Sequence, residues 1–279
     1  MTETTWINGE LAQFLDVADR GLQYGDGLFE TIAVFDGHPQ LLEFHLARLD
    51  RGVTKLKFPA IDLAQLESEI RLAATSMRKG VLKLILTRGV SARGYRPPEP
   101  TQPTRILCGG PWPAFPVSNS RQGVRARVCE QRLAIQPALA GVKHLNRLEQ
   151  VLARAEWSDP DVAEGIMLDT EGRLVCGSMS NLYLVHDHGI STPSLHRCGV
   201  YGVMREQVRS ACQALDLAWE ETDLSLQDAV DADEVFLSNA LVGLWPVREL
   251  DGRSYPDHPV CRELQEHLAG RGIRQCDLH

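Results

Sequence analysis

The chain has 279 residues, of which 43% are hydrophobic and 24% charged, and its formal net charge is −8. A chain of this length buries a sizeable core as one large domain or as two lobes, and its negative charge disfavours nucleic acid as a partner. It contains no apolar run near the length of a membrane span and no signal-peptide pattern at its start. We therefore expect a cytoplasmic protein without a membrane partner.

Seven cysteines are scattered along the chain without a Cys-x-x-Cys pair, at positions 108, 129, 176, 198, 212, 261 and 276. Such spacing is typical of reduced thiols and not of a disulfide framework or a zinc site. His186 and His188 are close in sequence, but they flank Asp187 in what the pattern predicts to be a turn between strands. We expect no metal site.

The first part of the chain is predicted to be α+β. Short strands are indicated at 5–8, 30–35, 81–87 and 104–108. The pair Asp36-Gly37 is typical of a hairpin turn. Apolar residues at helical spacing predict two helices between these strands, one with Leu42, Leu46, Leu49, Val53 and Leu56 on its inner face and one, capped by Asp62, with Leu63, Leu66, Ile70, Ala73 and Met77.

Three prolines among small and polar residues between positions 109 and 123 predict a linker, which divides the chain into an N-terminal lobe, 1–115, and a C-terminal lobe, 116–279. The second lobe is predicted to be mixed α/β. Its expected strands are 124–130, 165–168, 182–185 and 234–237. Its expected helices follow Lys143 and begin near Val200, the latter with Met204, Val208, Ala211, Cys212 and Leu215 on one face.

Lys143 lies in a short loop ahead of a predicted helix. Asn146 and Glu149 have the spacing of a capping box, and an apolar stripe at helical spacing follows, formed by Leu148, Val151, Leu152 and Ala155. A loop amine held by a rigid helix can be partly desolvated and kept neutral, as a lysine nucleophile requires. Most lysines are solvated surface charges, and the pattern alone leaves that alternative open.

Two further features are ambiguous from the residues alone. Gly199 and Gly202 precede a predicted helix, where backbone amides can bind an anion, but an ordinary turn needs the same glycines. Arg48 falls off the apolar stripe of its helix, so periodicity predicts a solvated charge.

Five segments, in order between residue 6 and about residue 250, resemble the motifs of the class IV pyridoxal-phosphate enzymes. They are 19–31 (DRGLQYGDGLFET), 44–49 (FHLARL), 143–150 (KHLNRLEQ), 199–205 (GVYGVMR) and 238–240 (SNA). The resemblance implies the two-lobed fold of that family (fold type IV), pyridoxal 5′-phosphate as cofactor, its covalent attachment to Lys143, and a homodimer. It further implies a cofactor-binding set drawn from several motifs, namely Arg48, Gly202, Val203, Met204, Asn239 and Ala240.

One position departs from the family pattern. The resemblance places a glutamate that contacts the pyridine nitrogen five residues before Asn181, and this chain has Cys176 there. A thiol is a poor partner for a pyridinium, so the ring should be a weaker electron sink. We expect this change to favour a lyase over a transaminase.

The segment 143–150 is most similar to the lyase branch of the family, which forms p-aminobenzoate for folate biosynthesis from 4-amino-4-deoxychorismate. The resemblance implies that Lys143 acts as general base and that pyruvate leaves. The two carboxylates of such a substrate suggest Arg93 and Tyr95, in the loop 93–96, as substrate contacts, although a flexible solvated turn is an equal alternative on composition. Thr31 is a further candidate.

Two rival functions remain. One is a class IV aminotransferase that acts on D-amino acids or branched-chain amino acids. The other is a protein that binds the cofactor, or a related phosphate ligand, without turning anything over.

Overall fold

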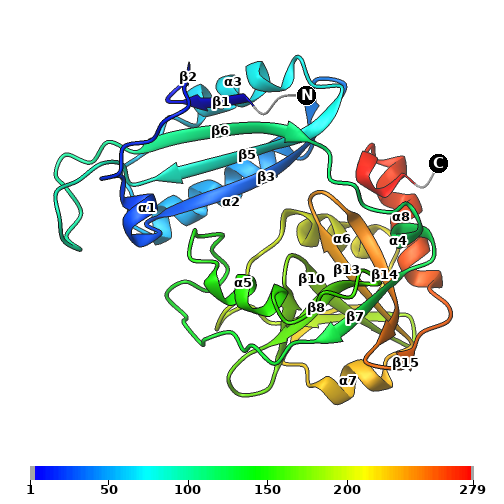
Figure 1. The fold of residues 1–279 in the computed structure, drawn as a ribbon. Helices are drawn as coiled ribbons and strands as arrows, with labels where there is room; N and C mark the ends of the chain where they lie inside the picture. Colours follow the sequence, from blue (N-terminus) through cyan, green and yellow to red (C-terminus); the bar gives the residue numbers. More distant parts are fainter. Residues whose placement is uncertain (1–3, 278–279) are drawn as a thin grey trace. The chain divides into compact units, whose positions relative to one another are not determined.

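The computed structural model describes residues 4–277 (Figure 1). Within that range the chain forms two compact units, one of residues 4–114 with 142–146 and the other of residues 115–141 with 147–277. The segment around Lys143 belongs to the first unit, which local sequence pattern does not predict. The lobe boundary stays a prediction.

The first unit is built on an antiparallel sheet with the strand order β2-β1-β6-β5-β3-β4. Its elements in chain order are β1 (Thr4–Ile7), β2 (Glu10–Leu11), α1 (Arg20–Tyr24), β3 (Gly27–Phe35), β4 (His38–Pro39), α2 (Leu42–Lys55), α3 (Leu63–Ala74), β5 (Lys79–Thr87) and β6 (Thr104–Pro111). Asp36 and Gly37 have φ angles of 49° and 79°, so they form the tight turn that the sequence predicts between β3 and β4.

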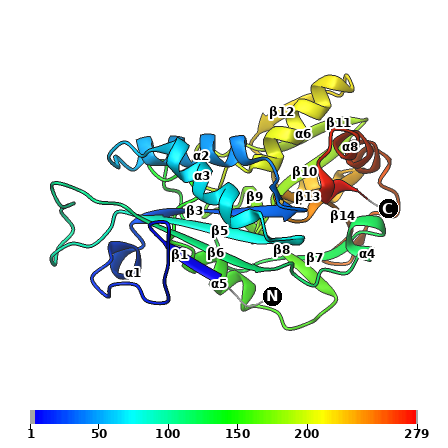
Figure 2. The same ribbon diagram turned by 90° about the horizontal axis from the view of Figure 1, so that it is seen from above.

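Helices α2 and α3 cover one face of this sheet (Figure 2). Alternate residues of β3 and β5 face the helices, and the predicted helical stripes meet them in one apolar core. The core includes Leu28, Ile32, Val34, Leu46, Leu49, Val53, Leu66, Ile70, Leu82, Leu84 and Leu86. The predicted Asp62 cap is confirmed, since its carboxylate accepts a hydrogen bond from Gln65 N at 2.9 Å. Leu56 and Met77 belong to the same core region but lie just beyond the helix ends.

The second unit contains a larger sheet with the order β12-β11-β10-β13-β14-β7-β8-β9, and β15 pairs with β14 at its side. Its elements are α4 (Ser118–Arg121), β7 (Val124–Val128), α5 (Leu148–Arg154), β8 (Val162–Leu168), β9 (Leu174–Gly177), β10 (Asn181–His186), β11 (Gly189–Pro193), α6 (Val203–Ala214), β12 (Trp219–Thr222), α7 (Leu226–Asp231), β13 (Glu234–Asn239), β14 (Gly243–Leu250), β15 (Arg253–Ser254), α8 (Pro259–Gly270) and the 3-10 turn Arg274–Cys276.

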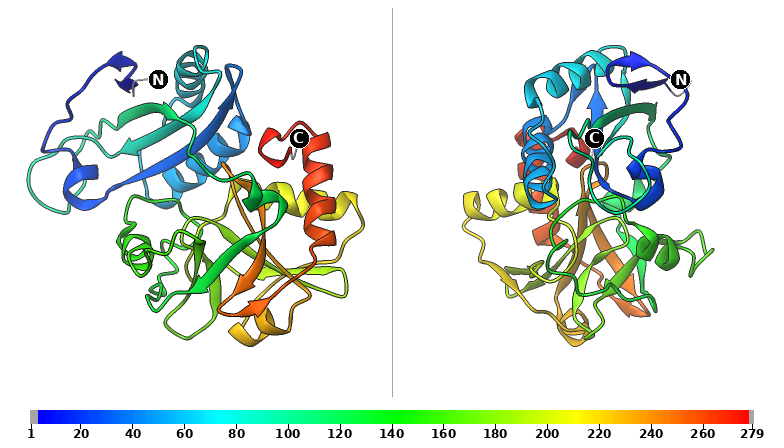
Figure 3. Two further views of the ribbon diagram at one scale, coloured as in Figure 1. Left: turned by 45° about the vertical axis from the view of Figure 1, so that its right-hand side comes forward. Right: turned by 90° about the vertical axis from the view of Figure 1, so that its left-hand side faces the viewer.

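Strands β10 and β13 are buried along almost their full length, which explains their continuous apolar sequence. Leu182, Leu184, Val235 and Leu237 contribute to the core on one face. Helices α6 and α8 pack against each other and against β13 (Figure 3). The predicted α6 is confirmed.

The predicted linker at 109–123 is wrong in part. Strand β6 continues to Pro111, and the short helix α4 occupies Ser118–Arg121. Proline can end a strand and small polar residues can begin a helix, so composition alone did not locate these elements.

Across residues 4–277, no helix combines the length and the apolar run that a bilayer crossing requires.

Candidate active site

Lys143 lies on an extended segment, residues 142–146, that pairs with the start of β3. Phe29 N donates a hydrogen bond to Lys143 O, and Leu145 N donates to Gly27 O, both at 3.0 Å. Glycine is required at position 27, because a Cβ atom there would lie 2.6 Å from the backbone carbonyl oxygen of Leu86, and the Leu145 side chain is equally close. The half-buried Lys143 side chain places Nζ 4.1 Å from the centre of the Phe29 ring. The amine is therefore carried by fixed backbone, against an aromatic face.

The predicted capping box after Lys143 is wrong. Helix α5 begins at Leu148 with Arg147 as its N-cap and no side-chain cap. The Asn146 amide instead donates to Gly25 O at 3.1 Å, and Glu149 Oε1 accepts from Ala134 N at 2.8 Å. Both side chains bond to residues distant in sequence, which local spacing cannot reveal.

The apolar stripe of α5 is exposed in the monomer. Leu148, Val151 and Leu152 are 70%, 60% and 50% exposed. The apolar pattern predicted the helix correctly, but the apolar face of this helix is not buried within the single chain.

Arg48 is buried, with 7% of its surface exposed, so the solvated charge that periodicity predicts is wrong. Its guanidinium pairs with Glu30 of β3, with Nε 2.8 Å from Oε1 and Nη2 on Oε2. His45 Nδ1 lies 2.6 Å from the same Oε2. These three buried side chains form one ionic cluster between α2 and β3.

The charges in this cluster are set by burial and by the arginine. Burial raises the pKa of Glu30, but the Arg48 guanidinium and the His45 hydrogen bond outweigh it and bring that pKa to about 2. Burial lowers the pKa of His45; the Glu30 carboxylate offsets this only in part, and the positive charges of Arg48 and Lys143 lower the pKa further. At neutral pH the cluster is a neutral imidazole with an ionised carboxylate–guanidinium pair.

The predicted substrate residues also lie in the first unit. Thr31 is partly exposed in β3, opposite Lys83 of β5. Arg93 is exposed in the loop after β5, and Tyr95 is 85% exposed.

In the second unit, Gly202 is the N-cap of α6, and Val203 and Met204 form the first turn of this helix. Within the described residues no side chain caps α6. A Cβ atom at Gly202 would lie 2.0 Å from Oδ1 of Asn181, a buried side chain whose Nδ2 donates to Val200 O at 2.9 Å, so any larger residue would displace it. The open N-terminus of this helix presents backbone amides and partial positive charge, which suits an anion.

Asn239 is the last residue of β13, and Ala240 follows it. The Asn239 side chain closes the turn, since Oδ1 accepts from Leu241 N at 2.9 Å and from Val242 N at 3.0 Å, and its Nδ2 donates to Met179 O at 3.2 Å. Ser238 is buried and bonded to the Tyr183 hydroxyl at 2.8 Å. The turn is thus rigid, and its role in phosphate binding stays a prediction.

Cys176 lies in β9 and is 7% exposed, packed in a cluster with Cys129, Met167 and Cys198. Burial raises the pKa of its thiol, and the nearby positive charge of Arg147 offsets this only in part. The group at this position is therefore neutral at physiological pH.

Sequence reasoning missed Glu164, a buried carboxylate in β8. It accepts hydrogen bonds from Ser178 Oγ at 2.5 Å, from Ser180 Oγ at 2.8 Å and from Ser178 N at 3.0 Å. Burial raises the pKa of Glu164, and these hydrogen-bond donors offset the rise only in part. Glu164 shapes the turn between Cys176 and Asn181. Its only signal in the sequence is a lone acidic residue inside an apolar strand.

The predicted site residues divide between the two units. The first unit carries Lys143, Arg48, Thr31, Arg93 and Tyr95; Lys143 lies against Phe29 of β3 and Arg48 pairs with Glu30 of the same strand. The second carries the remaining candidates, Cys176, Gly202, Val203, Met204, Asn239 and Ala240.

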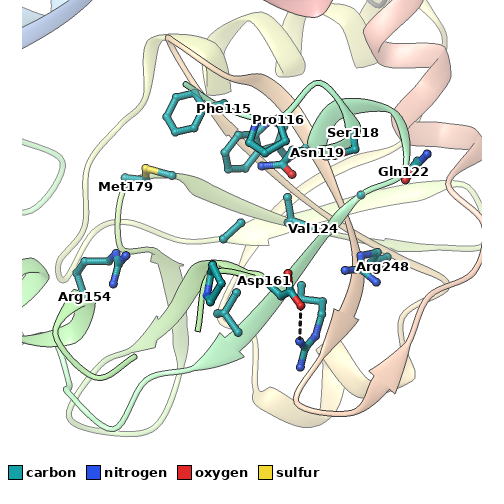
Figure 4. Close-up of a pocket in the computed structure, with 16 residues that line it drawn as sticks. Phe115, Pro116, Ser118, Asn119, Gln122, Val124, Arg154, Asp161, Met179 and Arg248 are labelled. Carbon is teal, nitrogen blue, oxygen red and sulfur yellow. Dashed lines mark ion pairs between the residues drawn. The ribbon is translucent and has the colours of Figure 1, made fainter. Parts of the chain in front are cut away.

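The second unit also contains a cavity of about 620 Å3 (Figure 4). Phe115, Asn119, Met179 and Arg248 are among its lining residues, and Asp161 in its wall pairs with Arg125 at 4.0 Å. The cavity shares no lining residue with the predicted site.

The family follows from comparison with known proteins. The sequence model described as amino-transferase class IV matches residues 27–250, which is more than half of the chain. The chain belongs to the class IV aminotransferase family. The resemblance inferred from the motifs is confirmed, and with it the class IV fold.

Proteins similar to this chain include two named as aminodeoxychorismate lyases and one named as an aminotransferase. The aminodeoxychorismate lyase of Vibrio harveyi is 35% identical over 267 residues, covering 94% of this chain and 98% of the relative. The crystal structure of 4-amino-4-deoxychorismate lyase from Pseudomonas aeruginosa is 50% identical, with a TM-score of 0.93, covering 95% of this chain and 98% of that one. A hypothetical aminotransferase from Mycobacterium tuberculosis in a PLP-bound form shares the fold at 22% identity, with a TM-score of 0.84, covering 96% of this chain and 99% of that one.

Proposed function

We propose that the protein is a pyridoxal-phosphate-dependent lyase that converts 4-amino-4-deoxychorismate into p-aminobenzoate and pyruvate. The observation that carries this proposal is the fixed placement of Lys143, whose Nζ rests 4.1 Å from the Phe29 ring on a segment bonded to β3. The proposed substrate is the one in the names of the two lyase relatives, which align over nearly the whole chain.

The residues present fit the proposed cofactor. The uncapped N-terminus of α6 offers amides to a phosphate, with Gly202 required by the closeness of Asn181. Lys143 offers an amine for covalent attachment. Asn239 and Ala240 would complete the phosphate site through their backbone. Arg48 would add positive charge, although its Nε and Nη2 already bind Glu30.

In this proposal Lys143 moves the protons of the reaction. Its Nζ accepts the proton from the substrate carbon that is made acidic, and the C–O bond to the enolpyruvyl group breaks. The same amine then returns a proton to the departing group, which leaves as pyruvate, while the ring becomes aromatic. The bound cofactor supplies the electron sink that makes the first proton removable.

The neutral Cys176 thiol suits a lyase better than a transaminase. At the position proposed to face the pyridine nitrogen, a buried thiol whose pKa is raised by burial cannot stabilise a pyridinium as a carboxylate would. A transaminase requires the strong sink in both half-reactions, whereas aromatisation drives the lyase.

We expect Cys176→Glu to raise transaminase activity at least about tenfold, because a carboxylate would restore the sink. Keto acid formation from D-alanine and from a branched-chain amino acid is measured beside p-aminobenzoate release. Cys212→Ser, a buried change in α6, serves as control. An unchanged product ratio and rate in Cys176→Glu would contradict the proposed role.

The purified protein tests the main proposal directly. Incubation with 4-amino-4-deoxychorismate should release p-aminobenzoate, and incubation with amino acids should release little keto acid. The alternative, an aminotransferase, is favoured by the family to which the chain belongs, and it predicts the opposite ratio. If the protein only binds the cofactor, borohydride will label Lys143 and neither product will form.

We further predict a homodimer in the cytoplasm. Exposed apolar side chains support the dimer, since Leu11, Phe14, Val17 and Leu22 are 66–87% exposed within one short stretch of the first unit. Light scattering of the pure protein should give twice the mass of the chain. Replacing Phe14 and Val17 together by serine should shift that mass towards the monomer without loss of the folded circular-dichroism spectrum. A wild-type monomer would remove the prediction.

A further inference from the structure

Arg20, the first residue of α1, is a buried arginine that bonds to a distant loop. Only 3% of its surface is exposed. Its Nη1 donates to Gly94 O at 2.9 Å and to Ser91 Oγ at 3.2 Å, and its Nη2 donates to Tyr95 O at 3.0 Å. One side chain thus holds the loop at three points, through two backbone carbonyls and the Ser91 hydroxyl.

Asp26 anchors this arginine. Its Oδ2 accepts from Arg20 Nε at 2.8 Å and from Arg88 Nε at 2.8 Å. Arg88 also donates to Leu56 O and Lys57 O at the end of α2. Arg88 thus links Asp26 to the end of α2. Because Asp26 is held there, it fixes the position and the orientation of the Arg20 guanidinium.

A second contact comes from Tyr24, the last residue of α1. Its hydroxyl accepts a hydrogen bond from Gly94 N at 3.2 Å, and its ring centre lies 5.5 Å from that of Tyr95. The loop backbone is therefore held from the α1 side, while the side chains of Arg93 and Tyr95 remain exposed.

We propose that Arg20 is a positioning residue for substrate binding, which fixes the loop backbone so that Arg93 and Tyr95 are presented to a dianionic substrate. This inference rests on the proposed function, because it takes the substrate to carry two carboxylates. Arg20 is buried and its donors are used on Asp26 and on the loop, so it contributes by fixing the position of the loop. A loop ordered in advance loses less conformational entropy when the substrate binds.

Arg20→Lys is the discriminating variant, because lysine keeps the charge but cannot reproduce a planar fork with donors in several directions. The Arg93–Gly94 bond, which joins an exposed arginine to a glycine held by Arg20 and Tyr24, offers a direct readout of loop order through the rate of tryptic cleavage. We expect cleavage there to become about tenfold faster, and the KM for 4-amino-4-deoxychorismate to rise about tenfold with kcat within about twofold. Tyr24→Phe, a smaller change, should move both values in the same direction by about threefold.

Arg105→Lys is the matched control. Arg105 of β6 forms a comparable partly buried fork with Glu69 of α3, at 2.8 and 3.0 Å, in the same unit, and it makes no hydrogen bond to residues 91–95 among those described. This variant should change neither the cleavage rate nor KM.

Unchanged cleavage in both Arg20→Lys and Tyr24→Phe would overturn the inference. Faster cleavage with an unchanged KM would overturn its substrate-binding part. Failure of the wild-type protein to release p-aminobenzoate would refute the proposed function, and the cleavage comparison would still report on the contact between Arg20 and the loop.

Discussion

Replacement of Lys143 by alanine should lower kcat for p-aminobenzoate release by about a thousandfold or more. The variant loses both the proposed covalent attachment point and the base that moves protons, and removing a general base alone costs about 10²–10⁴-fold. Single-turnover release of p-aminobenzoate measures the chemical step. Borohydride reduction followed by peptide mapping should label Lys143 in the wild-type protein and leave the variant unlabelled.

Lys79→Ala is the control for this experiment. Lys79 Nζ also lies over aromatic rings of the first unit, 4.8 Å from Trp112 and 5.6 Å from Phe35. The control tests whether loss of any lysine–aromatic contact in this unit reduces activity, and its rate should stay within about twofold of wild type. A Lys143→Ala protein that kept a tenth of the wild-type rate would refute the assigned chemistry.

Replacement of Glu30 by glutamine should lower the free energy of unfolding by about 3 kcal/mol at pH 7, because it leaves the buried Arg48 guanidinium without its counter-ion. Urea unfolding followed by circular dichroism measures this difference. Glu67→Gln is the control, since Glu67 pairs with Arg71 on an exposed helix face and should contribute no more than about 0.5 kcal/mol.

The pH dependence of the Glu30→Gln effect has a definite sign. The pKa of Glu30 is lowered from 4.5 to about 2 in the folded protein, so its stabilisation is fully present above pH 4.5 and is lost as the pH falls towards 2. The difference between the wild-type and variant stabilities should therefore begin to shrink below pH 4.5 and keep shrinking as the pH falls towards 2. A difference that stayed constant through that range would show that Glu30 does not act through its charge.

The elements that the sequence predicted correctly are those defined by residues close together in the chain. The stripe of α2, the Asp62 cap of α3 and the turn at Asp36-Gly37 each depend on residues within a few positions of one another, so local spacing was sufficient. Lys143 and Gly202 were selected because motif order added information that a single segment lacks.

What the sequence did not reveal depends on pairing across the chain. The Arg48–Glu30 pair spans 18 positions, and the Arg88–Asp26 bond spans 62. Helical periodicity predicts a solvated Arg48 because it takes no account of the strand β3, whose Glu30 binds this arginine. Asn146 failed as a helix cap for the same reason, since its amide bonds to Gly25, far earlier in the chain.

The membership of residues 142–146 in the first unit has a consequence for how the chain can be divided. A fragment ending at residue 114 would retain Arg48, Arg93 and Tyr95 but would lack the amine, which is encoded 29 positions later. The first unit therefore cannot be exchanged between homologues as one continuous stretch of sequence. A functional chimera must carry the short lysine segment across with it, because Leu145 of that segment packs against Gly27, which the fragment retains.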